Sequence, residues 1–539
     1  MPGTITSDQT TIKDAELTTD YLTLGTFATA PALNDDIKVQ GTNAINGRVS
    51  ANTAWSLAAT AAAIDMTVAD RHVWQWLRLI TWPSADTKAN GGLGISMSSD
   101  VTPTLTGTTP SNGPTNSKTW YLGGSNTDTI TGWVCYCVDP NSTPDLTLGT
   151  PVMSSIDRVG MRCKVTGTVS NKTLNLHHDV LRYGTGLTVK DGTSGAPVAF
   201  VDIATADALN ANAWGVLTQQ NGIYFVAGKL YFGTTGQTAV TYFKDTSNVV
   251  VFPQFPVAVS FYEFRTAGAG SFLTTFQLGT FSGGLTSAGC TIKGAGSGSA
   301  IAVWTLDGSA ANSTTNLYAC VLSQMRRGAL NSTCEMRGCT VVGSGELTTN
   351  GATINDCIFQ DVATAAPVSG TWALIVASPT EMGVITDCSF INCNKAIKIT
   401  TAGTYAFSGL QFSGNTFDVE NSSSGLVTIN VSGGGNTPVV TNTGGGSSQV
   451  NSNVGVTVTP LTTGSEVRVY LTGTATEVDG IESSTGSSFI FSVGSGVAVD
   501  IVILCVSPPK VPIRIQNTSF TSDQNLNPGQ LEDRNFNNP

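Results

Sequence analysis

Short apolar stretches that share one pattern recur between residues 285 and 417. Each begins with an apolar residue, continues with two spacers of which the second is small or Asp, and then has Cys or Asn, one spacer and another apolar residue. The clear copies span residues 317–322, 336–341, 354–359, 385–390 and 412–417, and a looser copy ends at residue 292. The shared positions, 18 to 31 residues apart, are Cys290, Cys320, Cys339, Cys357, Cys388 and Asn415.

Steps of roughly 20–30 residues are the length of one coil in a parallel β-solenoid, in which each coil buries its apolar face only by stacking on its neighbours. Period-two alternation directs the apolar residues inward and the spacers outward. The Cys or Asn position would then stack on its own copy in the next coil. The pattern predicts a parallel β-helix over residues 186–455, and the alternative is an antiparallel β-sandwich whose strands merely look alike.

The segment before the repeats has a different pattern. Alternating runs at 73–81, 92–97, 117–122, 131–138, 159–165 and 173–176 are separated by turn residues at spacings typical of a β-sandwich over residues 56–185. Five tryptophans fall in this segment, and we expect them in the core between two sheets, although one or two faces exposed for sugar stacking is the alternative. They are Trp74, Trp76, Trp82, Trp120 and Trp133.

The two ends of the chain are predicted to be small β-structures. Residues 1–55 are interpreted as an N-terminal arm or anchor with short strands at 21–24 and 37–40. Residues 198–201, 222–226, 229–232, 249–252 and 257–261 are predicted as the first strands of the coils. Residues 456–539 are predicted as a small antiparallel sandwich and tail. The sandwich would cap the end of the β-helix, because an uncapped end exposes unpaired backbone groups. Within this cap, Gly494-Ser495-Gly496 is expected to form a hairpin-like link.

Composition agrees with an all-β chain. Only 12 % of the 539 residues are charged and 59 are Gly, which suits short strands and turns and disfavours helices. The net charge of −11, without a basic patch, argues against nucleic-acid binding. No run approaches 18 apolar residues, so no membrane span is expected. The first residues lack the pattern of a secretion signal, so we expect folding in a cytoplasm.

The eleven cysteines are predicted to be reduced, buried thiols. Cys135 and Cys137 alternate around Tyr136 and should share one face of a strand. No CxxC pair with a matching His or Cys pair occurs, so neither a metal site nor a cofactor is predicted.

Three patterns are candidates for a catalytic or binding site. Asp356 and Asp387 hold the same repeat position, where adjacent coils would place two carboxylates at the spacing of glycoside hydrolysis. However, other copies have Ala or Gly there, so the position mainly requires a small or turn-forming residue. The coil region offers few other carboxylates and no cluster of aromatics beside them, so no catalytic residue is predicted.

The other two patterns are weaker. Gly192-Thr193-Ser194-Gly195-Ala196-Pro197, with His177, His178 and Asp179 upstream, is similar to the nucleophile loop of chymotrypsin-like proteases. Neighbouring His178 and Asp179 would point apart on a strand, so a triad is not expected. Gly294-Ala295-Gly296-Ser297-Gly298 lacks the ending of a phosphate loop and is interpreted as a turn.

Two segments together with the coils resemble right-handed β-helix proteins of tailed-bacteriophage virions, a likeness that covers roughly residues 64–539. One runs from Gly132-Trp133 through Cys137-Val138-Asp139-Pro140 to residues 179–187. The other is residues 464–470 together with the ending 533–539. The resemblance implies a right-handed helix, a homotrimer with one end fixed to the particle, and contacts to other virion proteins through the N-terminal region.

The resulting hypothesis is a structural virion protein: a trimeric fibre, spike or capsid decoration that is assembled in the host cytoplasm and possesses some adhesion to host-surface glycan. The alternative is a tailspike glycan depolymerase, and a third hypothesis is a secreted bacterial adhesin. The sequence leaves open whether the protein sits on the head or the tail.

Overall fold

The computed structural model describes residues 4–79, 92–106, 113–123, 133–165, 173–190, 194–209, 217–220, 223–226, 229–233, 241–252, 262–264, 274–281, 288–294, 305–308, 313–362, 372–494, 497–505, 507–520 and 523–533. It is about 57 % strand and 4 % helix, which confirms the all-β prediction. Two compact units are present, residues 1–350 with 360–373, and residues 351–359 with 374–539. No helix within the described ranges is long and apolar enough to cross a membrane.

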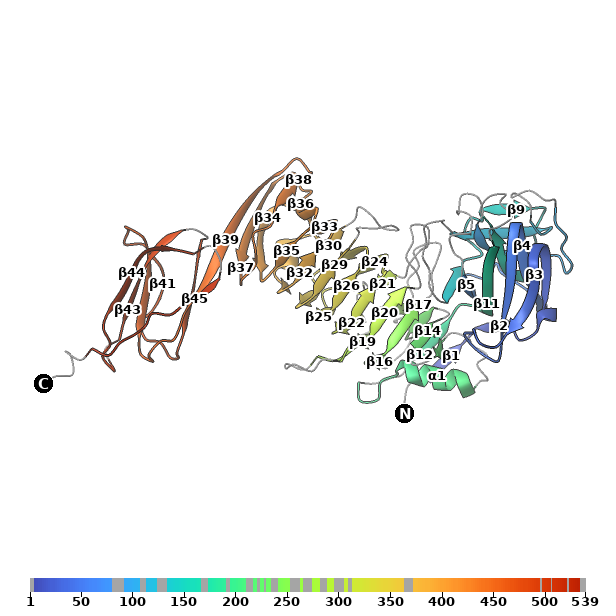
Figure 1. The fold of residues 1–539 in the computed structure, drawn as a ribbon, viewed down its shortest axis with the longest axis horizontal. Coiled ribbons are helices and arrows are strands. Elements are labelled where there is room, and N and C mark those ends of the chain that lie inside the picture. The colour runs from blue at the N-terminus through green and yellow to red at the C-terminus, as the bar shows by residue number, and fades with distance from the viewer. Residues whose placement is uncertain are drawn as a thin grey trace. The chain divides into compact units, whose positions relative to one another are not determined.

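The first unit begins with a ten-stranded sheet (Figure 1). Its strands are β2 (Thr10–Lys13), β3 (Tyr21–Asn34), β4 (Ala44–Ile64), β5 (His72–Leu79), β6 (Leu93–Ser98), β7 (Ser117–Gly123), β8 (Val134–Val138), β9 (Leu146–Leu148), β10 (Ile156–Lys164) and β11 (Thr173–Gly184), with a 3-10 turn, η1 (Thr18–Asp20), before β3. The order is β8-β5-β11-β4-β10-β6-β7-β9, with β2 on β11 and β3 on β4. The described strands of residues 1–55, expected as an arm, therefore belong mostly to this sheet.

The sheet folds over a single core. Tyr136 on β8 and Trp120 on β7 come from strands near opposite ends of the sheet, yet both lie in the same buried cluster. On the other face of β5 and β8, Trp74, Trp76, Cys135 and Cys137 pack in a second cluster that also contains Val251. The core positions predicted for these tryptophans and the shared face of the two cysteines are confirmed, whereas Trp82 lies outside the described residues.

The predicted strand at 37–40 is wrong. Those residues form bends, and the N–H groups of Val39 and Gln40 donate to the buried carboxylate of Asp179, at 2.8 and 3.1 Å. The Asp179 carboxylate thus supplies the hydrogen-bond acceptors that a neighbouring strand would otherwise give to these two N–H groups.

The coils of the first unit follow the sheet. Their strands, with β1 added from the N-terminus, are β1 (Thr4–Ser7), β12 (Leu187–Lys190), β13 (Leu217–Gln220), β14 (Ile223–Val226), β15 (Leu230–Phe232), β16 (Thr241–Asp245), β17 (Val249–Phe252), β18 (Tyr262–Phe264), β19 (Thr274–Leu278), β20 (Thr291–Gly294), β21 (Thr305–Asp307), β22 (Ser313–Tyr318), β23 (Val321–Ser323), β24 (Arg327–Ala329), β25 (Glu335–Arg337), β26 (Thr340–Val342) and β27 (Glu346–Thr348).

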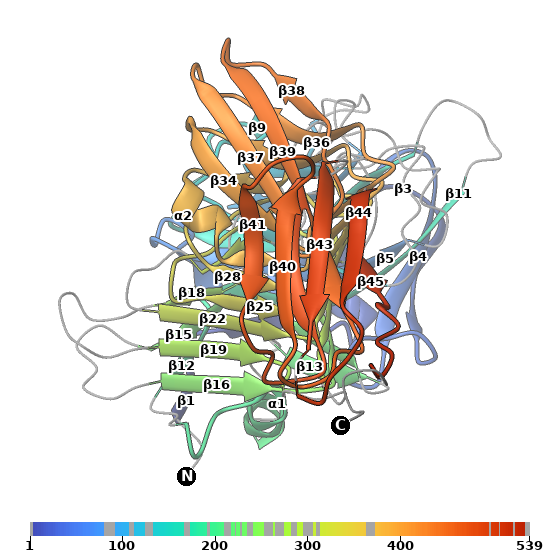
Figure 2. The same ribbon diagram turned by 90° about the vertical axis from the view of Figure 1, so that its left-hand side faces the viewer.

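Apart from the antiparallel pairs β1–β12 and β13–β14, neighbouring strands in these sheets differ by three in number and pair in parallel. Examples are β16-β19-β22-β25 (Figure 2) and β17-β20-β23-β26. Each coil therefore contributes one strand to each of three sheets, which is a parallel β-helix. The prediction of 257–261 as a strand falls outside the described residues.

A helix, α1 (Phe200–Leu209), replaces the strand predicted at 198–201. Phe200 is fully buried, its ring lies 4.9 Å from that of Phe243 and 5.9 Å from that of Tyr224, and its N–H donates to Asp245. The run after Val201 is rich in Ala and Asp and poor in β-branched residues, which favours a helix. The helix thus covers the first coils, where bare strands would be unprotected.

In the second unit the coil strands are β28 (Thr353–Asn355), β29 (Ile358–Gln360), β30 (Trp372–Val376), β31 (Ile385–Thr386), β32 (Ser389–Ile391), β33 (Lys395–Ile399), β34 (Gly403–Ser408), β35 (Gln411–Ser413), β36 (Phe417–Asn421), β37 (Leu426–Ser432), β38 (Val440–Asn442) and β39 (Ser447–Val458), with the short helix α2 (Pro379–Met382) between β30 and β31. Ring stacking fills the interior: Phe390 lies 5.1 Å from Phe359 and 5.3 Å from Phe412, nearly parallel to both.

The cysteine prediction holds for five of its six positions. Each of these five cysteines is the residue directly before a strand of one series within the nine-stranded sheet, β20-β23-β26-β29-β32. They are Cys290, Cys320 and Cys339 in the first unit, and Cys357 and Cys388 in the second. All eleven cysteines are free and buried, as predicted.

Stacked thiols donate to backbone carbonyls of the preceding coil. Cys320 donates to the Leu278 carbonyl at 3.4 Å, Cys339 to that of Leu317 at 3.2 Å, and Cys388 to that of Ile354 at 3.8 Å. In each case the acceptor is the apolar residue at the equivalent place in the preceding coil. A small buried residue with a donor therefore suits this position.

The sixth position is wrong. The register pairs Ser389 with Gln411, so Leu410, not Asn415, occupies the place equivalent to Cys388. Asn415 instead stacks on Cys393: its Oδ1 accepts the Cys393 N–H at 2.8 Å and its Nδ2 donates to the Phe390 carbonyl at 3.1 Å. Asn415 thus occupies the corner of the coil that follows β35, whereas Cys388 occupies the corner that precedes β32.

The C-terminal cap is a sandwich of two sheets. Its strands, besides β39, are β40 (Glu466–Leu471), β41 (Glu477–Ile481), β42 (Phe489–Gly494), β43 (Ala498–Leu504), β44 (Ile513–Ser519) and β45 (Gln524–Leu526). Strands β39, β42 and β45 face the sheet β41-β40-β43-β44 across one apolar cluster. The small C-terminal sandwich is confirmed.

Two details of the cap differ or lie outside the described residues. The hairpin expected around Gly494-Ser495-Gly496 is wrong, because β42 pairs with β39 and β43 pairs with β40 and β44, in different sheets. Residues 534–539, part of the ending that carries the phage resemblance, lie outside the described residues. The predicted boundaries at 55, 185 and 455 and the helix hand stay predictions.

Candidate functional site

A groove of about 360 Å³ lies on the outer face of the sheet β16-β19-β22-β25. Its lining residues are Lys244, Gln277, Thr280, Phe281, Tyr318, Glu335 and Arg337. In-register parallel pairing produces this set, because it aligns Lys244 with Gln277 and Tyr318 with Arg337 on neighbouring strands. Residues up to 93 positions apart in the sequence thereby line one surface.

Hydrogen bonds hold the polar side chains of the groove. The Tyr242 hydroxyl donates to Gln277 Oε1 at 2.6 Å, and Gln277 Nε2 donates to the Gly279 carbonyl at 3.1 Å. The Tyr318 hydroxyl donates to Glu335 Oε2 at 2.7 Å, and Arg337 forms an ion pair with the other carboxylate oxygen. The polar groups are therefore fixed before any ligand arrives.

An aromatic surface borders these polar groups. Phe281 is 39 % exposed, and its ring lies 6.5 Å from that of Tyr318. The Arg337 guanidinium lies 5.6 Å from the centre of the Phe281 ring. The sequence predicted no aromatic cluster beside a carboxylate in the coils, and this prediction is wrong. Phe281 and Tyr318 line one groove with Glu335 because the coils stack.

The Tyr318 phenol is a donor and not a base. Burial is the largest cause that raises its pKa above the usual range, and the hydrogen bond to Glu335 raises it further. Burial also raises the pKa of Tyr242. Both phenols therefore stay protonated across the physiological range.

Glu335 is the one carboxylate among the described residues that line the groove. Glycoside hydrolysis by the usual mechanism needs two carboxylates that flank the bond. Exposed aromatic faces beside fixed donors and acceptors instead fit a ligand with alternating apolar and hydroxyl surfaces. The groove is therefore equipped to bind such a ligand.

Asp356 and Asp387 are turn residues in the structure. Both are exposed and have a left-handed backbone with φ of 54°, and Ala319, Gly338 and Gly409 have the same conformation immediately before the equivalent strands. Asp387 accepts a hydrogen bond from Asn355 Nδ2 at 3.2 Å. Aspartate tolerates this conformation better than most residues, which explains its occurrence here.

The histidine segment forms no protease site. His178, on β11, is buried and bonds Ser56 Oγ at 3.0 Å, and the Tyr21 ring lies 4.8 Å away. The Asp179 carboxylate accepts hydrogen bonds from the N–H groups of Val39, Gln40 and Val180. It therefore binds backbone groups and does not orient a histidine as the acid of a triad would. Ser194 lies on an exposed turn, whereas residues 192 and 193, like 295–298 of the glycine-rich run, are outside the described residues.

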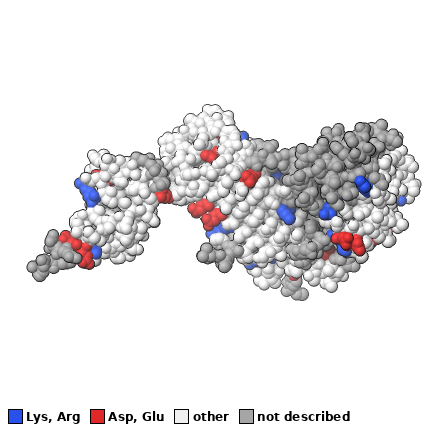
Figure 3. All heavy atoms as spheres, viewed as in Figure 1, with Lys and Arg blue, Asp and Glu red and all other residues white. Residues whose placement is uncertain are grey.

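Metal binding finds no support in the part of the chain that is described, where no group of three or more His, Cys, Asp or Glu side chains is arranged to hold an ion. Charged side chains are also sparse on the face shown in Figure 3. The groove brings Glu335, Arg337 and Lys244 together.

No protein-family model and no curated protein matches the chain. Among solved structures, the chain is similar to the catalytic domain of a GH87 α-1,3-glucanase in complex with nigerose, at 9 % identity and a TM-score of 0.23, over 77 % of this chain and 76 % of that chain. It is also similar to an endo-β-1,4-glucuronan lyase from the fungus Trichoderma reesei, at 9 % identity and a TM-score of 0.20, over 33 % of this chain and 96 % of the lyase.

An exo-β-agarase is similar at 7 % identity and a TM-score of 0.20, over 32 % of this chain, which covers 24 % of the agarase. The three similarities are weak, so no activity is carried over from these enzymes to this chain.

Proposed function

We propose that this chain is a glycan-binding β-helix protein that recognises a surface polysaccharide through the groove on β16, β19, β22 and β25. The observation that carries the proposal is the exposed Phe281 ring beside Tyr318 and the fixed polar groups of Glu335 and Arg337. The apolar C–H face of a sugar ring packs on an aromatic face, while its hydroxyls bond carboxylate and guanidinium groups.

The setting that we propose is the virion of a tailed phage, in which the protein is a homotrimeric fibre, spike or capsid decoration that contacts other virion proteins through its N-terminal region. Support comes from the sequence resemblance, from the helix α1 that covers the first coils, and from the sandwich that strand β39 joins to the last coils. Adhesion to host glycan is the role that suits a groove with one carboxylate. The alternative, a glycan depolymerase, requires a second acid that the described lining residues do not supply.

Substitutions in the groove are expected to weaken polysaccharide binding. Phe281→Ala and Tyr318→Ala should each weaken it about tenfold or more, because loss of an aromatic anchor at the centre of a contact typically costs more than 1 kcal/mol. Tyr318→Phe keeps the ring and loses only the bond to Glu335, so its effect should be smaller. Affinity electrophoresis against a panel of bacterial capsular polysaccharides measures these changes.

Tyr470→Ala, which removes a half-buried tyrosine in the C-terminal cap, is the matched control and should bind like the parent. Failure of the parent to bind any polysaccharide in the panel would overturn the proposal. A reducing-end assay on the same samples separates binding from cleavage: release of reducing ends by the parent and not by Glu335→Gln would establish the depolymerase instead.

A further inference from the structure

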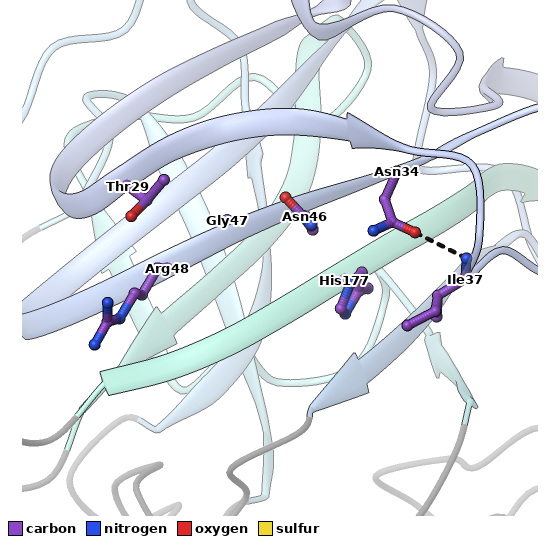
Figure 4. A pocket seen from close by; sticks show the side chains of 7 residues that line it. All are labelled: Thr29, Asn34, Ile37, Asn46, Gly47, Arg48 and His177. Carbon is purple, nitrogen blue, oxygen red and sulfur yellow. Dashed lines mark hydrogen bonds between the residues drawn. The ribbon is translucent and has the colours of Figure 1, made fainter.

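A second cavity, of about 330 Å³, lies on the ten-stranded sheet of the first unit (Figure 4). It is lined by Thr29, Asn34, Ile37, Asn46, Gly47, Arg48 and His177. These residues come from β3, β4, β11 and the bend after β3. His177 appeared in the protease-like sequence pattern, but that pattern did not predict this cavity, and the proposed glycan groove shares no residue with it.

Strand register brings the polar side chains together. Thr29 is paired with Arg48 across β3 and β4, and His177 is paired with Asn46 across β11 and β4. Asn46 and Arg48 are two residues apart on one strand and so share a face. Asn34 Oδ1 accepts the Ile37 N–H at 2.8 Å, which leaves Nδ2 as the donor of that amide.

His177 is the buried member of the set. Its side chain is 3 % exposed, and among the described residues its Nδ1 has no hydrogen-bond partner. The Trp133 ring meets its ring edge-on at 6.4 Å. Burial lowers the pKa of His177 to about 4, with a further contribution from Arg78, so the imidazole is neutral at physiological pH. A buried polar atom without a partner is uncommon and points to a missing ligand or water.

The charge of the lining selects the ligand. Among the described residues that line the cavity, Arg48 is the one charged side chain and none is Asp or Glu, although the net charge of the whole chain is −11. The hydroxyl of Thr29, the amides of Asn34 and Asn46, and the neutral imidazole of His177 add uncharged hydrogen-bonding groups. Ile37 supplies an apolar wall.

We propose that this cavity binds a sugar acid, a small hydroxylated molecule with one carboxylate. The planar fork of a guanidinium matches a carboxylate in two parallel hydrogen bonds. The uncharged amide, hydroxyl and imidazole groups match ring hydroxyls, and the apolar wall packs against ring C–H groups. This inference does not depend on the proposed glycan groove.

The test is titration calorimetry of the full chain with sodium D-glucuronate, with D-glucose as the uncharged analogue and acetate as the carboxylate without hydroxyls. Glucuronate should bind, and both analogues should bind at least about tenfold more weakly, because each lacks one half of the recognised groups. Arg48→Ala should weaken glucuronate binding roughly 10- to 100-fold. Asn46→Ala should weaken it less.

Arg48 is exposed, so its removal should not affect folding, and equal melting temperatures for Arg48→Ala and the parent verify this. Arg158→Ala, which removes an arginine outside the cavity, is the control for general loss of charge and should bind like the parent. Absence of glucuronate binding to the parent overturns the proposal. Equal affinity for acetate or for glucose, or full binding by Arg48→Ala, also overturns it.

Discussion

Replacing Cys357 with aspartate is expected to leave the chain unable to fold. Cys357 is fully buried, its thiol donates to the Asn355 carbonyl at 3.3 Å, and its own carbonyl accepts the Ser389 N–H of the next coil at 2.9 Å. An aspartate there would place an acceptor-only carboxylate against a carbonyl, away from water. An unpaired buried charge costs at least several kcal/mol, a large part of the stability of a typical protein.

Two variants serve as controls for Cys357→Asp. Ile358→Asp puts the same charge on the adjacent residue, whose side chain is 39 % exposed, and should fold. Cys357→Ser keeps a donor of similar size and should fold with a lower melting temperature. Soluble yield, circular dichroism and thermal melting measure the outcome. A soluble Cys357→Asp protein that melts like the parent would contradict the role assigned to the stacked thiols.

Mild acid is expected to destabilise the first unit through its buried imidazoles. The chain has three histidines, and burial is the leading cause that lowers the pKa of each, to about 4 for His177 and about 3 for His178. Their unfolded pKa is about 6.5. Between these values the unfolded state binds more protons than the folded state, so stability is present above pH 6.5 and is lost as the pH falls toward 4.

Asp179 acts in the opposite direction. Burial raises its pKa to about 7, against three backbone N–H donors and Arg182 that lower it. The folded state therefore binds more protons than the unfolded state between pH 4 and 7, and this term stabilises the fold on acidification. Burial also raises the pKa of Asp245, which acts in the same direction as Asp179. Since three histidines oppose these two aspartates, we expect a net loss of about 1–3 kcal/mol of stability between pH 7 and pH 4.

Urea unfolding of the parent and two variants at several pH values separates these terms. His178→Gln should flatten the dependence between pH 6.5 and 4.5, whereas Asp179→Asn should make it steeper, whatever either change does to stability at pH 7. Surface Asp145→Asn is the control and should leave the slope unchanged. A parent whose stability is constant from pH 7 to 4.5 would contradict the expected net loss, and an unchanged slope in His178→Gln would show that burial does not keep this imidazole neutral.

The repeat pattern predicted the β-helix because its two apolar positions are local and recur in every coil. It failed at Asn415 because two corners of the coil use similar sequences: both place a left-handed residue near a small buried one, as at Asp387 before Cys388 and at Asn392 before Cys393. Only the register of β32 with β35 separates them. Helix α1 was not predicted because residues 198–201, which lead into it, resemble a strand, whereas the Ala-rich residues that favour a helix follow them.

The candidate site was harder to predict than the fold. Lys244, Phe281 and Tyr318 lie in different coils, and nothing near each residue marks it as part of a groove. The exact length of each intervening loop decides whether they line up. The groove could be found by comparing the outward-facing residues of equivalent strands in successive coils. That comparison requires the strand register, which the sequence alone does not give.

Strand β39 belongs to both halves of the second unit: residues 447–452 pair with β37, and residues 453–458 pair with β42. A force applied to the cap therefore passes into the coils along one continuous backbone without a flexible joint. Hydrogen bonds across this strand are loaded in shear, so they resist together rather than opening one by one. A tether built in this way suits a protein that must stay attached under flow or collision.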